Sequence, residues 1–360
     1  MPIPGHRAQR RAPLLFAWSV LAIVASGHVR AEMAYRIYEP QDVTVPLNAP
    51  YVLSDGSVYI VGDDTMEPLL KRLNDLFVKT HPGIRFTMLL RSPPTGIDGI
   101  QAGVSLFAPV AYDAWETEIE PFKRLTGYRP LDVHIGRRGY AGAVRQNPPA
   151  IYVNASNPLP RLTLDQVGRI FTTGQSPSDL RHWSQLGAQG DWAKHAIHLY
   201  GTRDDGKTVT ALRTARFGGL PFARHYEALA EDADVLQALA GDRYGIGLVG
   251  FVDPATVPKE VRLVALAENA SAPSSLAAYE DVRHGRYPLA PYLHFYVRAA
   301  PGTPLNPVVK EYLRLALSID GQRIIEALQD GAQSYVPLTP EEALRELVKI
   351  DEPAAARPAQ

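Results

Sequence analysis

The stretch GTRDDGKTVTALR at residues 201–213 contains a Gly-Lys-Thr step with two acidic residues in front of it. It lies between AIHLYG (196–201), which is short and β-rich, and VTALRTARF (209–217), whose apolar residues have helical spacing. This pattern predicts a strand, a turn and the start of a helix. A helix start presents free backbone N–H groups and a positive dipole end, to which Lys207 would add a charge and Thr208 a hydroxyl. The stretch therefore suits anion binding, although an ordinary helix N-terminus with a solvated lysine has the same pattern.

Two further turns repeat this arrangement of a strand, a polar turn and a helix start. Gly-Asp-Asp-Thr (62–65) follows SVYIVG, and Arg-Ser-Pro-Pro-Thr (91–95) follows RFTMLL. In an open α/β sheet such turns lie at the carboxyl ends of strands, where ligands bind at a topological switch point. Each turn alone is weak evidence, because polar residues cap helices in all kinds of protein. Together they predict one cleft for a small anion.

The elements that would position these turns alternate along the chain. SVYIVG (57–62) reads as a buried strand, and the leucines that follow it recur with helical spacing up to Phe77. Strand and helix patterns then alternate through AIYVN (150–154) and YGIGLVGF (244–251) to a strand at LHFYVR (293–298). A chain of this kind predicts an α/β fold with a mostly parallel sheet and helices on both faces.

The first 31 residues have the pattern of an export signal. A start rich in arginine precedes the apolar run LLFAWSVLAIVASG, and Val-Arg-Ala offers a cleavage site after Ala31. Removing this segment would leave a net charge of about −5, which argues against nucleic acid as a partner. The chain contains no cysteine, so disulfides, thiolate catalysis and cysteine-bound metals are excluded. We expect an exported, periplasmic protein of about two domains.

Several longer stretches resemble a known family. GDDTMEPLLKRLNDLFVKTHPGIRF (62–86), IYVNASNPLPRLTLDQVGRIFTTG (151–174) and the run from GRYPLAPYLHFYVR to QRIIE (285–326) agree with it in order and spacing. The chain resembles the substrate-binding proteins of bacterial phosphate-uptake ABC transporters, within the type II periplasmic binding proteins. YGTRDDGKT stands where that family has an Arg, Asp and Ser-Gly-Thr loop.

The resemblance implies two α/β lobes joined by a two-crossover hinge. Residues 57–148 plus 290–349 would form lobe 1 and residues 149–289 lobe 2, after a signal peptide at 1–31 and before a disordered tail at 350–360. It implies capture of inorganic phosphate or a similar oxyanion by lobe closure, delivery to an inner-membrane ABC permease, a monomer, and neither enzymatic activity nor a cofactor. The ligand-binding residues would be Asp64, Thr65, Ser92, Thr95, Arg203, Gly206, Lys207 and Thr208.

The expected ligand loops depart from the family pattern in several places. Pro93 and Pro94 remove two amide donors from the second turn. Ala111 and Tyr112 occupy positions where the family has polar residues. The acids at 63, 64, 204 and 205 would repel a phosphate dianion unless they point outward or accept its protons. A different solute, a ligand-free scaffold or sensory homologue, and a periplasmic phosphoesterase therefore stay open.

Other candidate sites are weaker. His195 and His198 would lie on opposite faces of a strand, so a shared metal is not expected, and the remaining histidines are scattered. The acids at 63 and 64 are expected to be solvated turn residues rather than a metal site with those at 204 and 205. Ser92 has no Gly-x-Ser-x-Gly elbow, so it is not expected to be a nucleophile.

Overall fold

The computed structural model describes residue 1 and residues 34–140, 148–204, 208–330 and 334–351. The predicted signal peptide at 1–31 and most of the predicted tail lie outside these residues. Residues 350 and 351 are still helical, and Ile350 is only 2% exposed, so the tail prediction began two residues too early. No helix in the described ranges combines the length and the apolar character needed to cross a membrane.

The first lobe is built on a mixed sheet. Its strands are β1 (Val58–Gly62), β2 (Phe86–Leu90), β3 (Ala108–Val110), β4 (Leu131–Arg138), β12 (Tyr292–Val297) and β13 (Tyr335–Val336). β1 pairs with β2 in parallel, and the other four pair antiparallel in the order β13-β4-β12-β3. Two backbone hydrogen bonds join the two parts: Leu106 N donates to Tyr59 O (2.9 Å) and Asp63 N donates to Pro109 O (3.0 Å).

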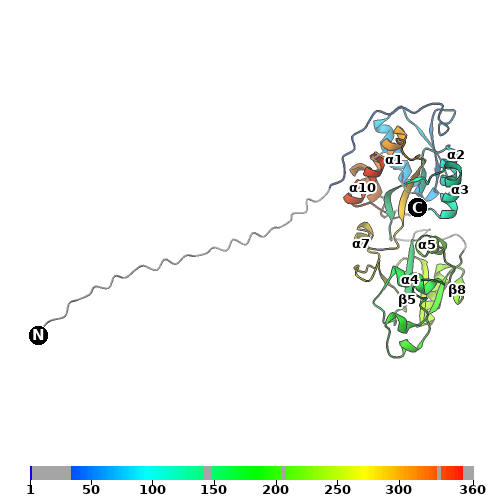
Figure 1. Cartoon of the computed structure of the whole chain (residues 1–360), viewed down its shortest axis with the longest axis vertical. Coiled ribbons are helices and arrows are strands. Elements are labelled where there is room, and N and C mark those ends of the chain that lie inside the picture. Colours follow the sequence, from blue (N-terminus) through cyan, green and yellow to red (C-terminus); the bar gives the residue numbers. More distant parts are fainter. Residues whose placement is uncertain (2–33, 141–147, 205–207, 331–333, 352–360) are drawn as a thin grey trace. The chain divides into compact units, whose positions relative to one another are not determined.

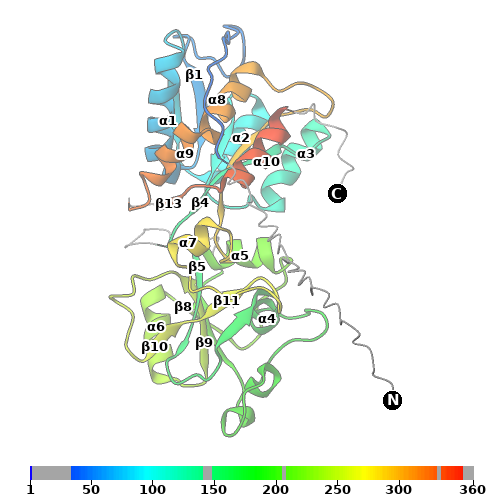
Figure 2. The same cartoon turned by 90° about the vertical axis from the view of Figure 1, so that its left-hand side faces the viewer.

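Six helices accompany this sheet (Figure 2). They are α1 (Glu67–Thr80), α2 (Pro93–Ala102), α3 (Glu116–Thr126), α8 (Pro307–Leu317), α9 (Ile319–Glu326) and α10 (Pro340–Asp351). In α1 the apolar positions 69, 70, 73 and 77 are all fully buried, which is the helical spacing read from the sequence. The hydrophobic effect of covering this face against the sheet and α8 holds the helix in place.

The second lobe has its own sheet with a corresponding strand order. The five strands are β5 (Pro149–Asn154), β7 (His198–Thr202), β8 (Tyr226–Leu229), β9 (Gly245–Gly250) and β10 (Val261–Leu263). They follow the order β10-β5-β9-β7-β8, with β7 parallel to both β8 and β9 and with β5 antiparallel to both neighbours. A small parallel pair is added by β6 (Arg161–Thr163) and β11 (Ala265–Ala267).

The helices of this lobe are shorter. They are α4 (Leu164–Phe171), α5 (Thr208–Arg216), α6 (Asp232–Gly241) and α7 (Tyr279–Arg283). The chain passes from the first lobe to the second between β4 and β5 and returns between α7 and β12 (Figure 1). The lobes have separate hydrophobic cores, one around Phe77, Phe107 and Tyr312 and one around Phe171 and Trp183. This is the predicted α/β fold of two lobes with two crossovers.

The prediction of a mostly parallel sheet is wrong in detail. β12 and β5 each begin directly after a crossover and lie antiparallel to the strands on both sides. The returning chain enters its sheet from the opposite end, so these strands reverse the direction of their neighbours. A second difference is the lead-in before β1, where Tyr35, Tyr38, Val43 and Val45 pack against the core of the first lobe.

Candidate functional site

A cavity of about 700 Å³ is lined by residues of both lobes. The first lobe contributes the start of α2 and the segment after β3, and the second contributes the end of β7, the start of α5 and the start of α6. Three of the predicted ligand residues, Ser92, Arg203 and Thr208, line it. Asp64, Thr65 and Thr95 are absent from the described lining, whereas Gly206 and Lys207 lie outside the described residues. The volume is within the range of small-molecule sites.

Arg138 is the cavity residue that sequence reasoning missed. It is the last residue of β4, lines the cavity and is only 7% exposed. Burial lowers the pKa of Arg138, while attraction to Asp63 acts in the opposite direction. A guanidinium this far from water is stabilised by nearby negative charge, and a guanidinium matches oxyanion geometry. The signal that could have found β4 is the alternation of apolar residues at 131, 133 and 135.

The polar side chains of the first turn (62–65) form hydrogen bonds within the protein. Asp63 is 1% exposed, so the prediction that it is a solvated turn acid is wrong. Its Oδ1 accepts hydrogen bonds from Thr65 N (2.9 Å) and Thr65 Oγ1 (2.7 Å), and its Oδ2 accepts one from Ala111 N (3.1 Å). Burial raises the pKa of Asp63, and these hydrogen bonds offset that rise only in part. Because a hydroxyl has one proton to donate, Thr65 does not offer it to an anion in this conformation.

In the second turn (91–95) a threonine hydroxyl again donates its hydrogen bond within the turn. Thr95 Oγ1 donates to Ser92 O (2.6 Å), so its proton is also committed within the turn. Pro93 and Pro94 are the first two residues of α2 and line the cavity. They supply no N–H groups there, as expected from the sequence. Within the described residues, the hydroxyl of Ser92 makes no capping hydrogen bond, which makes it the donor that this turn can offer.

The third segment gives the cavity an aromatic wall. Tyr112 and Trp115 line it with ring centroids 5.8 Å apart. Tyr112 Oη donates to Glu118 Oε1 (2.5 Å), and Trp115 N donates to Glu118 Oε2 (2.7 Å). Burial raises the pKa of Glu118, with hydrogen bonds from Tyr112 and Trp115 acting against the rise. The partly buried carboxylate of Glu118 therefore holds this wall through hydrogen bonds from Tyr112 and Trp115.

The fourth loop leads from β7 into α5. Asp204 accepts a hydrogen bond from Thr210 Oγ1 (2.5 Å) and forms an ion pair with Arg213 Nη2 (3.0 Å). It lines a separate cavity of about 420 Å³ rather than the one between the lobes. Arg203 is exposed and Thr208 partly buried, both at the cavity beside the start of α5. A helix start favours anions, so the arrangement of Arg203 and Thr208 at this end of α5 is compatible with anion binding.

The same loop also has the spacing Gly-x₄-Gly-Lys-Thr, which is typical of a nucleotide-binding P-loop. Its first glycine, Gly201, lies inside β7 rather than after it. A Cβ there would come within 2.0 Å of the Tyr226 hydroxyl and 2.8 Å of Leu248 O. The close packing of β7 against its neighbours therefore explains this glycine without a nucleotide.

Charged groups of both signs surround the cavity. Its described lining includes three arginines, of which Arg203 and Arg216 are exposed, and four acids: Asp113, Glu118, Glu231 and Asp232. Among these charged residues Arg138 is buried, Asp113, Glu118 and Asp232 are partly buried, and Glu231 is exposed. A partly protonated anion such as phosphate can donate to a carboxylate as well as accept from an arginine, so mixed charges are compatible with it.

Comparison with known proteins identifies the family. A family model described as a PBP superfamily domain matches residues 52–319. The phosphate-binding protein PstS of Pseudomonas aeruginosa is 28% identical over 298 residues, which covers 81% of this chain and 87% of that protein. The phosphate-binding protein PstS of Bacillus subtilis is 24% identical over 289 residues, covering 79% and 82%.

The fold is shared with a solved structure. The crystal structure of PstS from Borrelia burgdorferi matches 78% of this chain and 98% of its own, with a TM-score of 0.53 and 14% identity. At this identity the likeness concerns the fold alone. Taken with the family match over most of the described chain, it shows that the protein belongs to the PBP superfamily and has the type II periplasmic-binding-protein fold.

Proposed function

We propose that the protein captures phosphate or a related oxyanion in the cavity between its lobes and delivers it to an inner-membrane ABC permease. The relatives named above are phosphate-binding proteins, and they align over about four fifths of this chain. The proposal places the protein in the periplasm after cleavage at Ala31, as a monomer without catalytic activity. It assigns residues 57–148 plus 290–351 to lobe 1, which extends the predicted boundary of 349 to the end of α10, and residues 149–289 to lobe 2.

The observation that carries the proposal is the buried Arg138 at the cavity wall. A cation that is 7% exposed can bind an anion from which water has been removed, which makes a charge-assisted hydrogen bond stronger than it is on the surface. Ser92 from the first lobe and Thr208 from the second line the same cavity. An anion there would be bound by groups of both lobes in the closed state and by groups of one lobe in the open state. The resulting higher affinity of the closed state drives closure.

The experiment is a calorimetric titration of phosphate, then sulfate and arsenate, into mature protein that has been unfolded and refolded to remove bound ligand. We expect saturable phosphate binding with one site per chain and a higher Tm in its presence. Absence of both heat and thermal stabilisation for all three oxyanions would refute the proposal. Sulfate serves as the control for protonation, because it has the shape of phosphate but carries no proton to donate at neutral pH.

A second candidate is an organic phosphate ester. The cavity of about 700 Å³ and the aromatic wall of Tyr112 and Trp115 would accommodate an organic group beside the anion. The same calorimeter decides between the two, with a sugar phosphate and an aryl phosphate as additional ligands. Tighter binding of either ester than of phosphate, reversed by Tyr112→Ala, would favour this candidate.

A further inference from the structure

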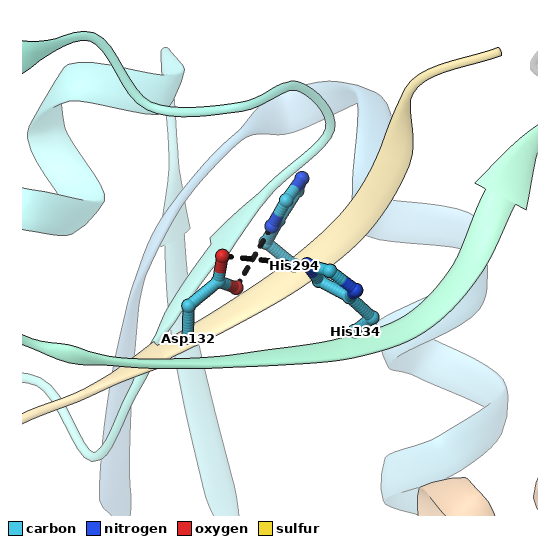
Figure 3. Close-up of side chains that lie close together, drawn as sticks. All are labelled: Asp132, His134 and His294. Carbon is cyan, nitrogen blue, oxygen red and sulfur yellow. Dashed lines mark hydrogen bonds and ion pairs between the residues drawn. The ribbon is translucent and has the colours of Figure 1, made fainter. Parts of the chain in front are cut away.

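Three potential metal ligands lie together on the first sheet, on the face opposite the core of that lobe. Asp132 and His134 are two residues apart in β4 and therefore point to the same side. His294 lies on the neighbouring strand β12, where its backbone is in register with His134. Figure 3 shows the three side chains converging from these two strands. One ligand atom from each lies within 4.8 Å of the other two.

The separations are close to those of a metal's coordination sphere. His294 Nδ1 is 2.8 Å from Asp132 Oδ1, and His134 Nε2 is 3.4 Å from Asp132 Oδ2. Ligand atoms of a tetrahedral zinc ion lie about 3.3 Å apart, because the bonds are about 2.0–2.2 Å long. Small side-chain rotations would therefore bring the three ligands around one ion. Imidazole and carboxylate are also the ligands that suit Zn²⁺ and neighbouring transition metals.

Each histidine has a carboxylate behind its other ring nitrogen. His134 Nδ1 is 3.6 Å from Glu346 Oε1 on α10, and His294 Nε2 is 3.6 Å from Asp113 Oδ1. The His294 side chain is fully buried, and its Nε2 has no hydrogen-bond partner among the described residues. Metal-binding histidines commonly donate their second N–H to a carboxylate, which orients the ring and raises its basicity. In this cluster each of these second nitrogens faces a carboxylate oxygen at 3.6 Å, which is longer than a hydrogen bond, so a small shift would complete the arrangement.

Aromatic stacking fixes the two imidazole rings. Tyr292 stacks on His134 at 4.0 Å with 13° between the planes, and Tyr296 stacks on His294 at 5.3 Å with 2°. Rings held in this way lose little freedom when they coordinate an ion. The side chains of His134 and Asp132 are 24% and 36% exposed, so an ion can reach the cluster from solvent.

The charge balance also favours a cation. Asp132, Asp113 and Glu346 surround the histidines, whereas Lys349 is the cation that contacts these acids, through Glu346 Oε2 at 2.6 Å. Burial lowers the pKa of His294, but Asp132 raises it overall; three carboxylates against Lys349 and one protonated imidazole still leave an excess of negative charge among the described residues. A divalent ion would compensate this excess and would replace the hydrogen bond between His294 and Asp132.

We propose that Asp132, His134 and His294 bind a divalent transition-metal ion, Zn²⁺ being the expected one, with water as the fourth ligand. Three protein ligands and one open position are a common tetrahedral arrangement. Asp132, His134 and His294 are absent from the described lining of the oxyanion cavity, although Asp113 behind His294 lines it; the metal proposal does not rest on the proposed function.

The test is a titration of Zn²⁺ into tag-free, chelator-treated mature protein, with His134→Gln as the ligand variant. We expect one saturable site in the wild type and an affinity lower by more than about 100-fold in the variant, since loss of an outer carboxylate alone costs about 10- to 100-fold. His198→Gln is the matched control: it removes a histidine paired with one carboxylate, Asp242, at 2.6 Å, which is too few ligands for a comparable site. Its affinity should equal that of the wild type.

A second measurement covers the case in which His134→Gln fails to fold. The visible absorption spectrum of Co²⁺ bound to the wild type should be that of a tetrahedral complex, and Zn²⁺ should displace it. Zn²⁺ should also raise the Tm of the wild type and of His198→Gln. Equal Zn²⁺ affinity in His134→Gln and wild type, the absence of a saturable site, or a Co²⁺ spectrum of the octahedral aqueous type would overturn the proposal.

Discussion

Replacement of Arg138 by methionine tests the central feature of the oxyanion site. The side chain is 7% exposed at the cavity wall, so an anion that it binds is largely removed from water. A hydrogen bond to a charged group contributes about 1.5–3 kcal/mol. Since about 1.4 kcal/mol corresponds to a factor of ten, the Kd for phosphate should rise by about 10- to 150-fold. Methionine retains the length and apolar contacts of the arginine stem while removing its charge and donors.

The matched control is Arg216→Met, which removes an exposed arginine from the same cavity. An exposed charge contributes about 0–1 kcal/mol, so its Kd should change by no more than about fivefold. Both variants are measured by calorimetric titration with phosphate at fixed ionic strength, and by thermal unfolding without ligand. An unchanged Kd in Arg138→Met, or an equal loss in both variants, would refute the assignment of Arg138 as the main anion contact.

Folding and binding effects of Arg138 can be separated. The variant leaves Asp63, which is 1% exposed, without the positive charge that attracts it, although Asp63 keeps its hydrogen bonds from Thr65 and Ala111. If Arg138→Met is unstable, the double variant with Asp63→Asn removes this buried charge. A recovered Tm together with continued loss of phosphate affinity would attribute the loss to the missing guanidinium.

Three further predictions concern stability and the fourth loop. Glu342→Gln should lower the free energy of unfolding at pH 7 by about 3–5 kcal/mol, because it leaves Arg137, whose side chain is 3% exposed, without its carboxylate. Burial alone would raise the pKa of Glu342, but Arg137 lowers it below its usual value of 4.5, so this stabilisation is present above pH 4.5 and is lost as the pH falls further. Urea unfolding from pH 7 to pH 3 should therefore show a flatter dependence of stability on pH for the variant than for the wild type, and parallel profiles would contradict the assignment. Gly62→Ala should lower the free energy of unfolding by about 1–3 kcal/mol, since its Cβ would lie 2.6 Å from Pro109 O, and an unchanged Tm would show that β1 and β3 separate easily. Lys207→Ala should weaken phosphate binding by about 1–3 kcal/mol in calorimetry if the lysine supplies charge to the site, and an unchanged Kd would remove it from the site.

Much of the fold could be predicted because its signals are local. The leucine-rich helix up to Phe77 and the strand around 293–298 follow from apolar periodicity, and the structure places α1 and β12 there. The strand β4 was missed, since Arg137 and Arg138 end its apolar alternation with charged residues. Long-range pairing decided whether strands run parallel, and the sequence pattern does not contain that information.

The candidate site was predictable only in part. Ser92, Arg203 and Thr208 line the cavity, as expected for turns at the carboxyl ends of strands. Thr65 and Thr95 direct their hydroxyl protons to neighbours within their own turns. Hydrogen-bond partners of a short polar side chain depend on backbone geometry at the level of a single turn, and residue type alone does not specify that geometry.

The sequence by itself determined most of the alternating strands and helices and two of the turns at the cavity, those of Ser92 and of Arg203 with Thr208, because hydrophobic periodicity and turn composition act over a few residues. The two lobes followed from the family resemblance. Tertiary structure alone decided the burial of Asp63 and Arg138 and the meeting of Asp132 with His294, which are 162 residues apart. These features depend on the register of β4 against β12 and on where the crossovers place each strand. The packing of the whole lobe determines such contacts, so no local sequence pattern predicts them.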